Sequence, residues 1–434
     1  MRKRLFFGVG GIGVAAALAL AATGIATTGK SSVTPLPSSS CSPVQYGGTG
    51  SPQFLIASDL PLQGSGRTQT IEMTKAIAFE LKQLGWKAGK YTIGYQSCDD
   101  STAAAGKWDP AKCSANASNY VRDKSVLGVI GTFNSGCAEI EVPVGNRAGL
   151  QWISPANTYV GLTHTPALPG EPQKYYPTGK RTYARVVATD DFQGSADVLI
   201  MKQNSVKSLY VLNDKEAYGF GIASAVRNVA KHEGITVAGF QAWDPKASSY
   251  QDIASKISSS GADAVFLGGL ICENGGKLIK DLKAGAPNAI IYAPDGFSSF
   301  TDVASGAGSA ADGMTVSIAG VPYKDLPGPA KKFAVTFGKS IGLTATKVNP
   351  YSNYAAAALQ VMMSAIAQSG GTRPGVTKGV YGKSFASTPI GPISLNKVGD
   401  PKAGIVSFYK IGNGGGTFLK LIKPPLSLVA LAKP

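Results

Sequence analysis

Residues 126–158, VLGVIGTFNSGCAEIEVPVGNRAGLQWISPANT, decide the fold of this chain. They contain two short apolar runs, 126–130 and 150–153, each bounded by Gly, Ser or Asn. Such runs are typical of buried parallel strands. The spacing between them predicts a helix over about residues 138–147, although Pro143 is unfavourable inside a helix.

A turn of small polar residues follows each of these predicted strands, 132–136 after the first and 154–158 after the second. The carboxyl ends of parallel strands meet at one edge of an open sheet, and ligands bind at that edge. Hydroxyl groups and free backbone N–H groups would gather there. The stretch therefore predicts a site for a carboxylate or another small anion.

The composition indicates a folded chain of two ordinary domains, because it has 434 residues of which 44% are hydrophobic. A formal net charge of +16 raises the hypothesis of binding to nucleic acid or to a membrane surface. However, the Lys and Arg residues are scattered over the polar faces of predicted helices, without a basic stripe interleaved with aromatics. We expect a solvated basic surface and no nucleic-acid partner.

The amino terminus has the pattern of an export signal. Three basic residues precede an apolar run over residues 5–22, and small residues follow it. We predict a signal peptide over residues 1–26 and an extracytoplasmic location, in the periplasm or at the cell surface. An uncleaved membrane anchor is the alternative, because the run approaches the length that spans a bilayer. Residues 27–52 are rich in Ser, Thr, Pro and Gly and predict a flexible tether.

Five cysteines in an exported chain predict disulfides with one thiol left over. Cys98 and Cys113 flank a polar insertion and are the predicted pair. The pairing of Cys41, Cys137 and Cys272 stays open. Lipid attachment at Cys41 is a further alternative, although the Leu expected three residues earlier is missing. No Cys/His cluster has the spacing of metal ligands, so we expect no metal.

Strands and helices alternate along the chain in two successive series. The first series covers residues 53–158, and the second begins at residue 208 and reaches Asp295. Such alternation predicts parallel, doubly wound sheets. Two series predict two similar lobes with a ligand cleft between them.

Several short motifs support a more specific interpretation. They are the Asp59-Leu60-Pro61-Leu62-Gln63-Gly64 turn, Val129-Ile130-Gly131 with Ser135, Ile153-Ser154-Pro155-Ala156 with Thr158, Asp214 with Tyr218-Gly219, and Tyr354-Ala355-Ala356. Over residues 53–411 the chain resembles the type I periplasmic solute-binding proteins, specifically the branched-chain amino-acid (leucine/isoleucine/valine) binding family of ABC importers. The resemblance implies an α/β fold of two doubly wound βα lobes joined by three hinge crossovers.

The resemblance also implies where the lobes begin and end. The crossovers would lie near Val187, Ile318 and Gly371. The implied parts are lobe 1 over residues 53–187 and 319–371, lobe 2 over 188–318 and 372–423, and an apolar tail over 424–434.

The resemblance further implies a ligand site with contributions from both lobes. Ser135, Ala156 and Thr158 would hold a ligand carboxylate. Asp295 would pair with the ligand's ammonium group, and Tyr218 would close over the ligand. This arrangement agrees with the chemistry of the residues, with donors for an anion on one lobe and a carboxylate for a cation on the other. Each residue also has a structural interpretation, as a cap, a turn residue or a packed surface ring.

The chain departs from this family in two places. Residues 270–273 read Leu-Ile-Cys-Glu where several relatives carry aromatics, and Asp295 is shorter than the commoner Glu. Both changes widen the candidate ligands to amides, urea or aromatic acids. We interpret Glu273 as a solvated helix start, and His164 and His232 as structural or exposed residues.

These features together favour a non-catalytic receptor that captures a small polar solute, an amino acid of the branched-chain type or an analogue. It would deliver that solute to the membrane subunits of an ABC importer, and no cofactor is expected. An exported enzyme is less favoured, because the chain has two His and no G-x-S-x-G, H-E-x-x-H or P-loop motif. A sensory ligand-binding ectodomain of similar fold is the third hypothesis.

Overall fold

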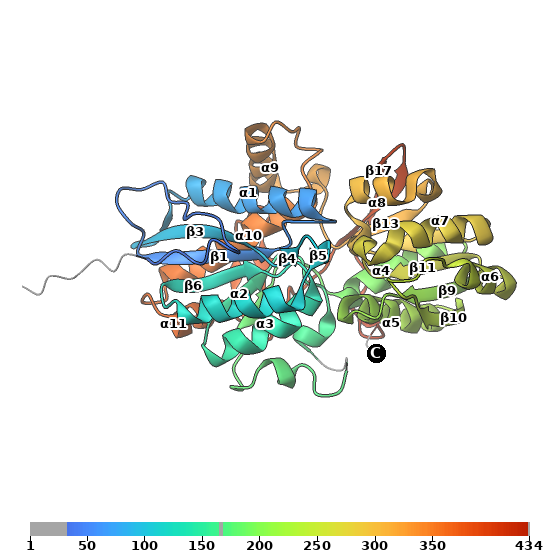
Figure 1. Cartoon of the computed structure of the whole chain (residues 1–434), viewed down its shortest axis with the longest axis horizontal. Coiled ribbons are helices and arrows are strands. Elements are labelled where there is room, and N and C mark those ends of the chain that lie inside the picture. The colour runs from blue at the N-terminus through green and yellow to red at the C-terminus, as the bar shows by residue number, and fades with distance from the viewer. Residues whose placement is uncertain (1–32, 165–167, 433–434) are drawn as a thin grey trace, which may run out of the picture. The chain divides into compact units, whose positions relative to one another are not determined.

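The computed structural model of the protein describes residues 33–164 and 168–432. It contains two large β-sheets, each covered by helices on both faces (Figure 1). The predicted α/β class with two doubly wound lobes is therefore confirmed. The predicted signal peptide, residues 1–26, lies outside the described residues. Among the helices of the described ranges, none has the length and apolar character needed to cross a membrane.

Lobe 1 contains the following strands and helices: β1 (Phe54–Leu60), α1 (Arg67–Gln83), β2 (Lys87–Ala88), β3 (Tyr91–Asp99), β4 (Ser101–Thr102), β5 (Lys107–Trp108), α2 (Pro110–Arg122), β6 (Val126–Gly131), α3 (Ser135–Arg147), β7 (Gln151–Ser154), β8 (Tyr183–Arg185), α9 (Gly328–Ser340), α10 (Pro350–Ala367), α11 (Arg373–Lys378), β14 (Ser384–Phe385) and β15 (Ile393–Ser394). Its main sheet has the order β2-β3-β1-β6-β7-β8, and all strands except β2 run parallel. Helices α1 and α10 cover one face, and α2 and α3 cover the other (Figure 1).

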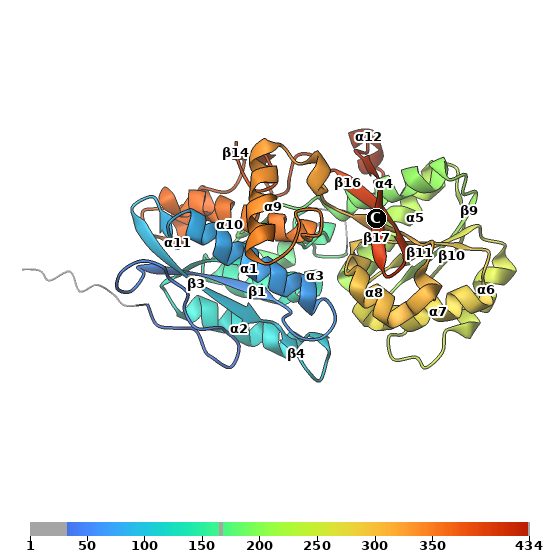
Figure 2. The same cartoon turned by 90° about the horizontal axis from the view of Figure 1, so that it is seen from above.

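Lobe 2 contains the following strands and helices: α4 (Asp190–Gln203), β9 (Ser208–Asn213), α5 (Ala217–His232), β10 (Thr236–Ala242), α6 (Gln251–Ser260), β11 (Ala264–Gly268), α7 (Gly276–Gly285), β12 (Ile290–Ala293), α8 (Phe300–Ala307), β13 (Thr315–Ile318), β16 (Val406–Gly412), β17 (Gly415–Ile422) and α12 (Leu426–Val429). Its sheet has the order β10-β9-β11-β12-β13-β16-β17. Strand β16 runs antiparallel to both of its neighbours, β13 and β17. Helices α4 and α5 pack on one face, and α6, α7 and α8 pack on the other (Figures 1 and 2).

The two apolar runs of the deciding stretch form β6 and β7, which pair in parallel and are buried along their whole lengths. Helix α3 begins at Ser135, three residues before the predicted start, and it continues through Pro143. The earlier start matters for function. It places the first turn of α3 directly at the carboxyl end of β6.

Three connections join the lobes. The first runs from the end of β8 at Arg185 to the start of α4, and the second from the end of β13 at Ile318 to the start of α9. The third was expected near Gly371, and this expectation is wrong. Residues 372–400 pack on lobe 1, because the buried Arg373 side chain donates to the carbonyl oxygens of Val126 and Tyr120 at 3.0 and 2.9 Å. The chain joins the sheet of lobe 2 only at β16.

Residues 33–46 of the predicted tether pack on lobe 1. Leu36 and Cys41 are buried, and the backbone of this segment pairs with the outer side of β3. Leu36 N–H donates to Gln96 Oε1 at 2.8 Å, and Ser42 N–H donates to the Ser97 carbonyl at 2.8 Å. Composition alone suggested a tether, but these contacts fix residues 33–46 on lobe 1.

The predicted apolar tail also packs on the folded part. It forms α12, which contacts α4, and Leu428 and Ala432 are buried in the core of lobe 2.

The predicted disulfide between Cys98 and Cys113 is wrong. Cys98 pairs with Cys41, and Cys113 pairs with Cys137, which leaves Cys272 as the free cysteine among the described residues. Cys98 lies on β3, beside the amino-terminal segment that carries Cys41. Cys113 lies on α2, which packs against α3. Closeness in the sequence therefore gave no guide to the pairing.

A cluster of buried carboxyl groups lies beneath α3. Asp59, Asp100 and Glu141 are fully buried, and Asn116 donates to Asp59 Oδ1 at 3.0 Å. Burial raises the pKa of Asp59 to about 6, and burial raises the pKa values of Asp100 and Glu141 well above their usual range. These groups bind protons more tightly in the folded than in the unfolded chain.

Replacing Asp59 by Asn should stabilise the protein in a pH-dependent way. Because the folded pKa is raised, the contribution of Asp59 to stability is complete below about pH 4 and is lost as the pH rises through about 6. Asn keeps the neutral form at every pH and can still accept from Asn116. We expect a gain of about 3 kcal/mol in the free energy of unfolding at about pH 8 and almost none at about pH 4, measured by urea denaturation. Asp312→Asn, at an exposed position, is the control. Equal gains at both pH values would contradict the role of ionisation.

Candidate functional site

One pocket brings the five predicted site residues together. Ser135 follows β6, Ala156 and Thr158 follow β7, Tyr218 follows β9, and Asp295 follows β12. Each residue therefore lies just beyond the carboxyl end of a parallel strand, where open α/β sheets bind ligands. The cavity between them has a volume of ≈ 20 Å³, which is room for about one water molecule.

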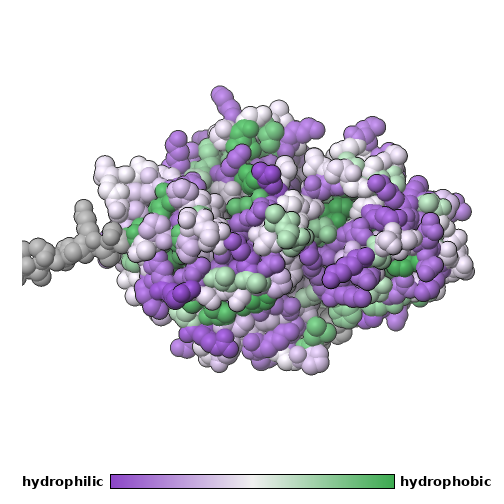
Figure 3. Space-filling view, viewed as in Figure 1, coloured by the Kyte–Doolittle hydropathy of each residue, from purple (hydrophilic) through white to green (hydrophobic). Residues whose placement is uncertain are grey.

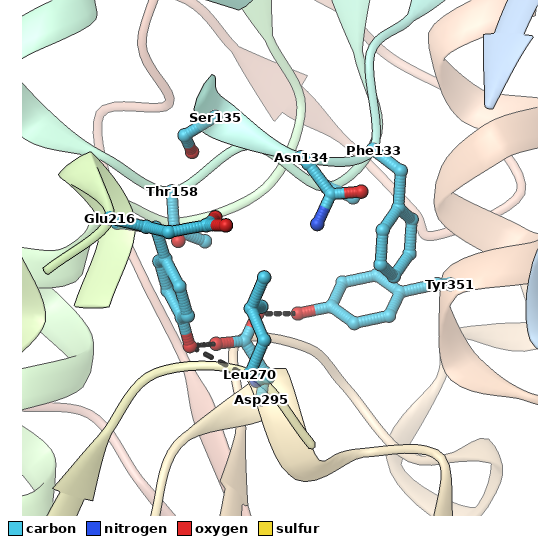
Figure 4. A pocket seen from close by; sticks show the side chains of 11 residues that line it. Phe133, Asn134, Ser135, Thr158, Glu216, Leu270, Asp295 and Tyr351 are labelled. Atoms are coloured by element: carbon cyan, nitrogen blue, oxygen red, sulfur yellow. Dashed lines mark hydrogen bonds between the residues drawn. The ribbon is translucent and has the colours of Figure 1, made fainter. Parts of the chain in front are cut away.

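The lobe 1 side of the pocket presents hydrogen-bond donors (Figure 4). Ser135 is the first residue of α3, and no side chain caps the N–H groups of this helix. Thr158 is buried, and its carbonyl oxygen accepts from the backbone N–H of Asp190 at 2.9 Å. A free helix amino terminus together with two hydroxyl groups favours an anionic group at this side.

A hydrogen-bond network holds two turns in place, residues 132–136 after β6 and residues 154–158 after β7. Ser154 Oγ donates to the Thr132 carbonyl at 2.7 Å and accepts from the backbone N–H of Ala156 at 3.1 Å. Asn157 Nδ2 donates to the Phe133 carbonyl at 2.8 Å. Because the turn after β6 is tied to the turn after β7, Ser135 and Thr158 are positioned together.

The lobe 2 side of the pocket presents a buried carboxyl group. Asp295 is 8% exposed, and it accepts one hydrogen bond from Tyr218 Oη and one from Tyr351 Oη, each at 2.5 Å (Figure 4). Burial raises the pKa of Asp295, and the two tyrosine hydrogen bonds offset part of that rise. Tyr351 belongs to α10 of lobe 1, so this contact joins the two lobes.

Further acidic groups surround Asp295. Asp190 and Asp197 are fully buried on α4, and burial raises the pKa of each well above its usual range. The charge of Asp295 raises both pKa values further. Among the described residues that line the pocket, none is Lys or Arg. This side of the pocket therefore favours a cationic group.

Six further residues line the pocket and were not predicted as site residues: Phe133, Asn134, Glu216, Leu270, Gly296 and Tyr351. Phe133 and Tyr351 form an apolar wall with an edge-to-face ring contact of 6.3 Å. Phe133, Asn134, Glu216 and Gly296 are sequence neighbours of predicted residues, so their proximity could have been inferred. Tyr351 gave no such signal.

A charged contact between the lobes involves Glu216, which lines the pocket. Lys107 of lobe 1 forms an ion pair with Glu216 at 3.0 Å and a second ion pair with Glu273, both in lobe 2. Burial raises the pKa of Glu216 to about 7, Glu273 raises it further, and Lys107 opposes the rise. The interpretation of Glu273 as a solvated helix start is wrong, because its side chain is buried against Lys107.

His164 has a structural role, since it contacts Asp191 and Asp400.

The sequence matches a known family over most of its length. A family described as periplasmic binding protein matches residues 60–414. The chain belongs to the periplasmic binding protein family. Two curated relatives of this periplasmic binding protein share about a quarter of their residues with it. The Leu/Ile/Val-binding protein homolog 3 of Brucella melitensis is 26% identical over 310 residues, which cover 70% of this chain and 77% of the relative. The leucine-, isoleucine-, valine-, threonine-, and alanine-binding protein of Pseudomonas aeruginosa is 25% identical over 295 residues, covering 68% and 74%.

Solved structures show the same fold as this periplasmic binding protein. The leucine-binding protein LivK of Thermotoga maritima has a TM-score of 0.73 and 20% identity, and the match covers 86% of this chain and 99% of that one. A solute-binding protein of an ABC transporter from R. palustris, in complex with 4-hydroxybenzoate, has a TM-score of 0.71 and 15% identity over 86% and 98% of the chains. The type I fold inferred from the sequence motifs is thus confirmed, while the solutes of these neighbours differ.

Proposed function

We propose that this protein is an extracytoplasmic receptor that binds a small zwitterion, an amino acid of the branched-chain type or an analogue, without turning it over. It then delivers the solute to an ABC importer. The observation that carries the proposal is the position of Asp295 across one pocket from Ser135 and Thr158. Donors for a carboxylate and an acceptor for an ammonium group face the same small space.

The chemistry of each side assigns one end of the ligand. The ligand carboxylate accepts hydrogen bonds from the hydroxyl groups of Ser135 and Thr158 and from the amino-terminal N–H groups of α3. The ligand ammonium group pairs with Asp295, while Tyr218 keeps its hydrogen bond to that carboxylate. The ligand side chain packs against the apolar wall that includes Phe133 and Leu270.

A buried carboxylate distinguishes amino acids from aromatic acids. A benzoate has no ammonium group, so it would leave Asp295 buried without a cationic partner and close to a second anion. Such an arrangement costs several kcal/mol in a desolvated site. Asp295 therefore supports an amino-acid ligand, as in the names of the curated relatives, rather than the 4-hydroxybenzoate of the R. palustris neighbour.

Binding requires the lobes to separate and close again. The cavity has room for about one water, and the contacts of Tyr351 with Asp295 and of Lys107 with Glu216 join its two sides. We infer that these contacts break to admit the solute. Lobe closure then favours the liganded state, because contacts from both sides exist only when the solute is enclosed.

A thermal-shift series with leucine, two fragments of it and an aromatic acid tests the proposal. The fragments are 4-methylpentanoate, which lacks the ammonium group, and 3-methylbutylamine, which lacks the carboxylate; the aromatic acid is 4-hydroxybenzoate. We expect stabilisation by leucine, isoleucine or valine, of about 2.7 kcal/mol when the free ligand is 100 times its Kd, and little by either fragment or by 4-hydroxybenzoate. Mass spectrometry should recover the ligand unchanged. Stabilisation by 4-hydroxybenzoate alone, or conversion of the ligand, would contradict the proposal.

The native solute can be identified in the same preparation. Mass spectrometry of small molecules released from gently purified protein should find an amino acid or a close analogue. A solute without an amino group would overturn the assignment of Asp295.

A further inference from the structure

One edge of the lobe 1 sheet carries a row of exposed cations. The loops that lead into β3, β6, β7 and β8, each taken with the end of the element before it, contribute at least one each, because the amino ends of parallel strands meet at the same edge. The row consists of Lys87, Lys90, Arg122, Lys124, Arg147 and Lys180, all exposed. None of them forms an ion pair with a described residue. These loops carry two acidic residues: Asp123, which is partly buried and accepts from Ser125 N–H at 2.8 Å, and Glu171, which is buried and forms an ion pair with Lys174 at 2.8 Å.

The equivalent edge of lobe 2 has no such imbalance. Its loops and adjoining helix ends carry Lys202, Lys207, Lys231 and Lys283, but also Glu233, Asp263 and Asp312. Glu233 is paired with Lys202 at 2.6 Å. The same structural edge is thus close to neutral in one lobe and strongly positive in the other. The formal charge of +16 is therefore not spread evenly over the surface.

The row is long enough to contact several anionic groups together. Lys90 precedes β3 and Lys180 precedes β8, and these strands lie four steps apart in the sheet. At about 4.8 Å for each step, the row spans roughly 19 Å. Hydrophilic residues cover most of the face in Figure 3, where hydrophobic residues form small separate groups. A charged partner therefore suits this molecule better than an apolar one.

The amino-terminal segment reaches the folded part at this same edge. Residues 34–37 line a shallow groove together with Arg122, Asp123 and Lys124.

We propose that this cationic edge docks on an anionic phospholipid surface. Each Lys or Arg near such a surface increases the partition about five-fold. The candidate ligand pocket lies at the opposite, carboxyl ends of the same strands, so docking leaves it open to solute. This inference is independent of the solute and of the proposed function.

Vesicle flotation of the full chain tests the proposal. The vesicles contain phosphatidylcholine alone or phosphatidylcholine with about a third of phosphatidylglycerol. The edge variant combines Lys90→Glu, Lys124→Glu and Lys180→Glu. The control variant combines Lys207→Glu, Lys231→Glu and Lys283→Glu, which changes the net charge equally on the lobe 2 edge. All six positions are exposed, so both variants should keep the melting temperature of the wild type.

We expect the edge variant to lose roughly 100-fold in affinity for the anionic vesicles, and the control to lose less than about 5-fold. Binding to phosphatidylcholine alone should not change. Equal losses in both variants, or no preference for anionic vesicles, would overturn the proposal. Edge-dependent binding to soluble polyphosphate without binding to vesicles would assign the edge to an anionic polymer instead and would also overturn it.

Discussion

Replacing Asp295 by Asn should weaken the binding of a zwitterionic ligand by about 2–5 kcal/mol, a loss of roughly 30-fold to several thousand-fold in affinity. Asp295 is buried, and its two carboxylate oxygens are held by Tyr218 and Tyr351. Asn preserves the shape and one acceptor for these hydroxyl groups but removes the negative charge. The ligand ammonium group would then be buried without a counter-ion. Isothermal titration calorimetry with leucine or the native solute measures the loss.

A ligand that lacks the ammonium group provides the matched control. With 4-methylpentanoate, Asp295→Asn should improve binding, because the variant no longer buries two anions in one pocket. Opposite changes for the two ligands would assign the ammonium group to Asp295. Parallel losses would instead indicate a structural role, and unchanged affinity for leucine would remove Asp295 from the site.

The residues that gather at one edge of a sheet were the most predictable part of this molecule. The runs 126–130 and 150–153 became β6 and β7 because they are apolar and bounded by turn residues. Parallel pairing then brings Ser135 and Thr158 together without any further information. The same rule places Tyr218 and Asp295 at the corresponding edge of lobe 2.

Residues that reach the pocket from a distant element could not be predicted in this way. Tyr351 enters from α10, after the chain has left lobe 2 and returned to lobe 1. Its hydrogen bond to Asp295 depends on how the two lobes meet, which no local pattern encodes. The Tyr354-Ala355-Ala356 motif lies on the same helix but did not indicate the residue that contacts the site.

Composition misled where a few specific contacts decide the structure. The segment containing Cys41 is rich in Ser and Pro and was expected to be a tether, yet Leu36 and the disulfide to Cys98 fix it on β3. The family resemblance likewise misled at the third crossover, which it implied near Gly371. The chain stays in lobe 1 because the guanidinium group of Arg373 binds carbonyl oxygens of lobe 1.

Replacing Arg185 by Met should destabilise the protein by about 3–5 kcal/mol. Arg185 is fully buried at the first crossover, and Nε donates to Asp400 Oδ1 at 2.8 Å, next to the third crossover. Nη1 donates to the carbonyl oxygens of Asn157 and Tyr159, each at 2.9 Å. Burial alone would raise the pKa of Asp400, but Arg185 and then His164 hold it below its usual value. Removing the guanidinium group therefore leaves Asp400 ionised and buried with His164 as its main partner.

Arg185→Met should also weaken ligand binding. The two carbonyl oxygens that Arg185 Nη1 holds belong to Asn157 and Tyr159, the residues on either side of Thr158. We expect urea denaturation to show the full loss for Arg185→Met and less than about 0.5 kcal/mol for Arg147→Met, an exposed arginine. Adding Asp400→Leu to Arg185→Met should restore a large part of the stability, since the unpaired charge is then removed. It should not restore ligand affinity, because the carbonyl oxygens on either side of Thr158 still lack their donor. If the double variant recovered both stability and ligand affinity, Arg185 would act on the site only through Asp400. The hydrogen bonds of Arg185 to Asn157 and Tyr159 would then not be needed to position Thr158.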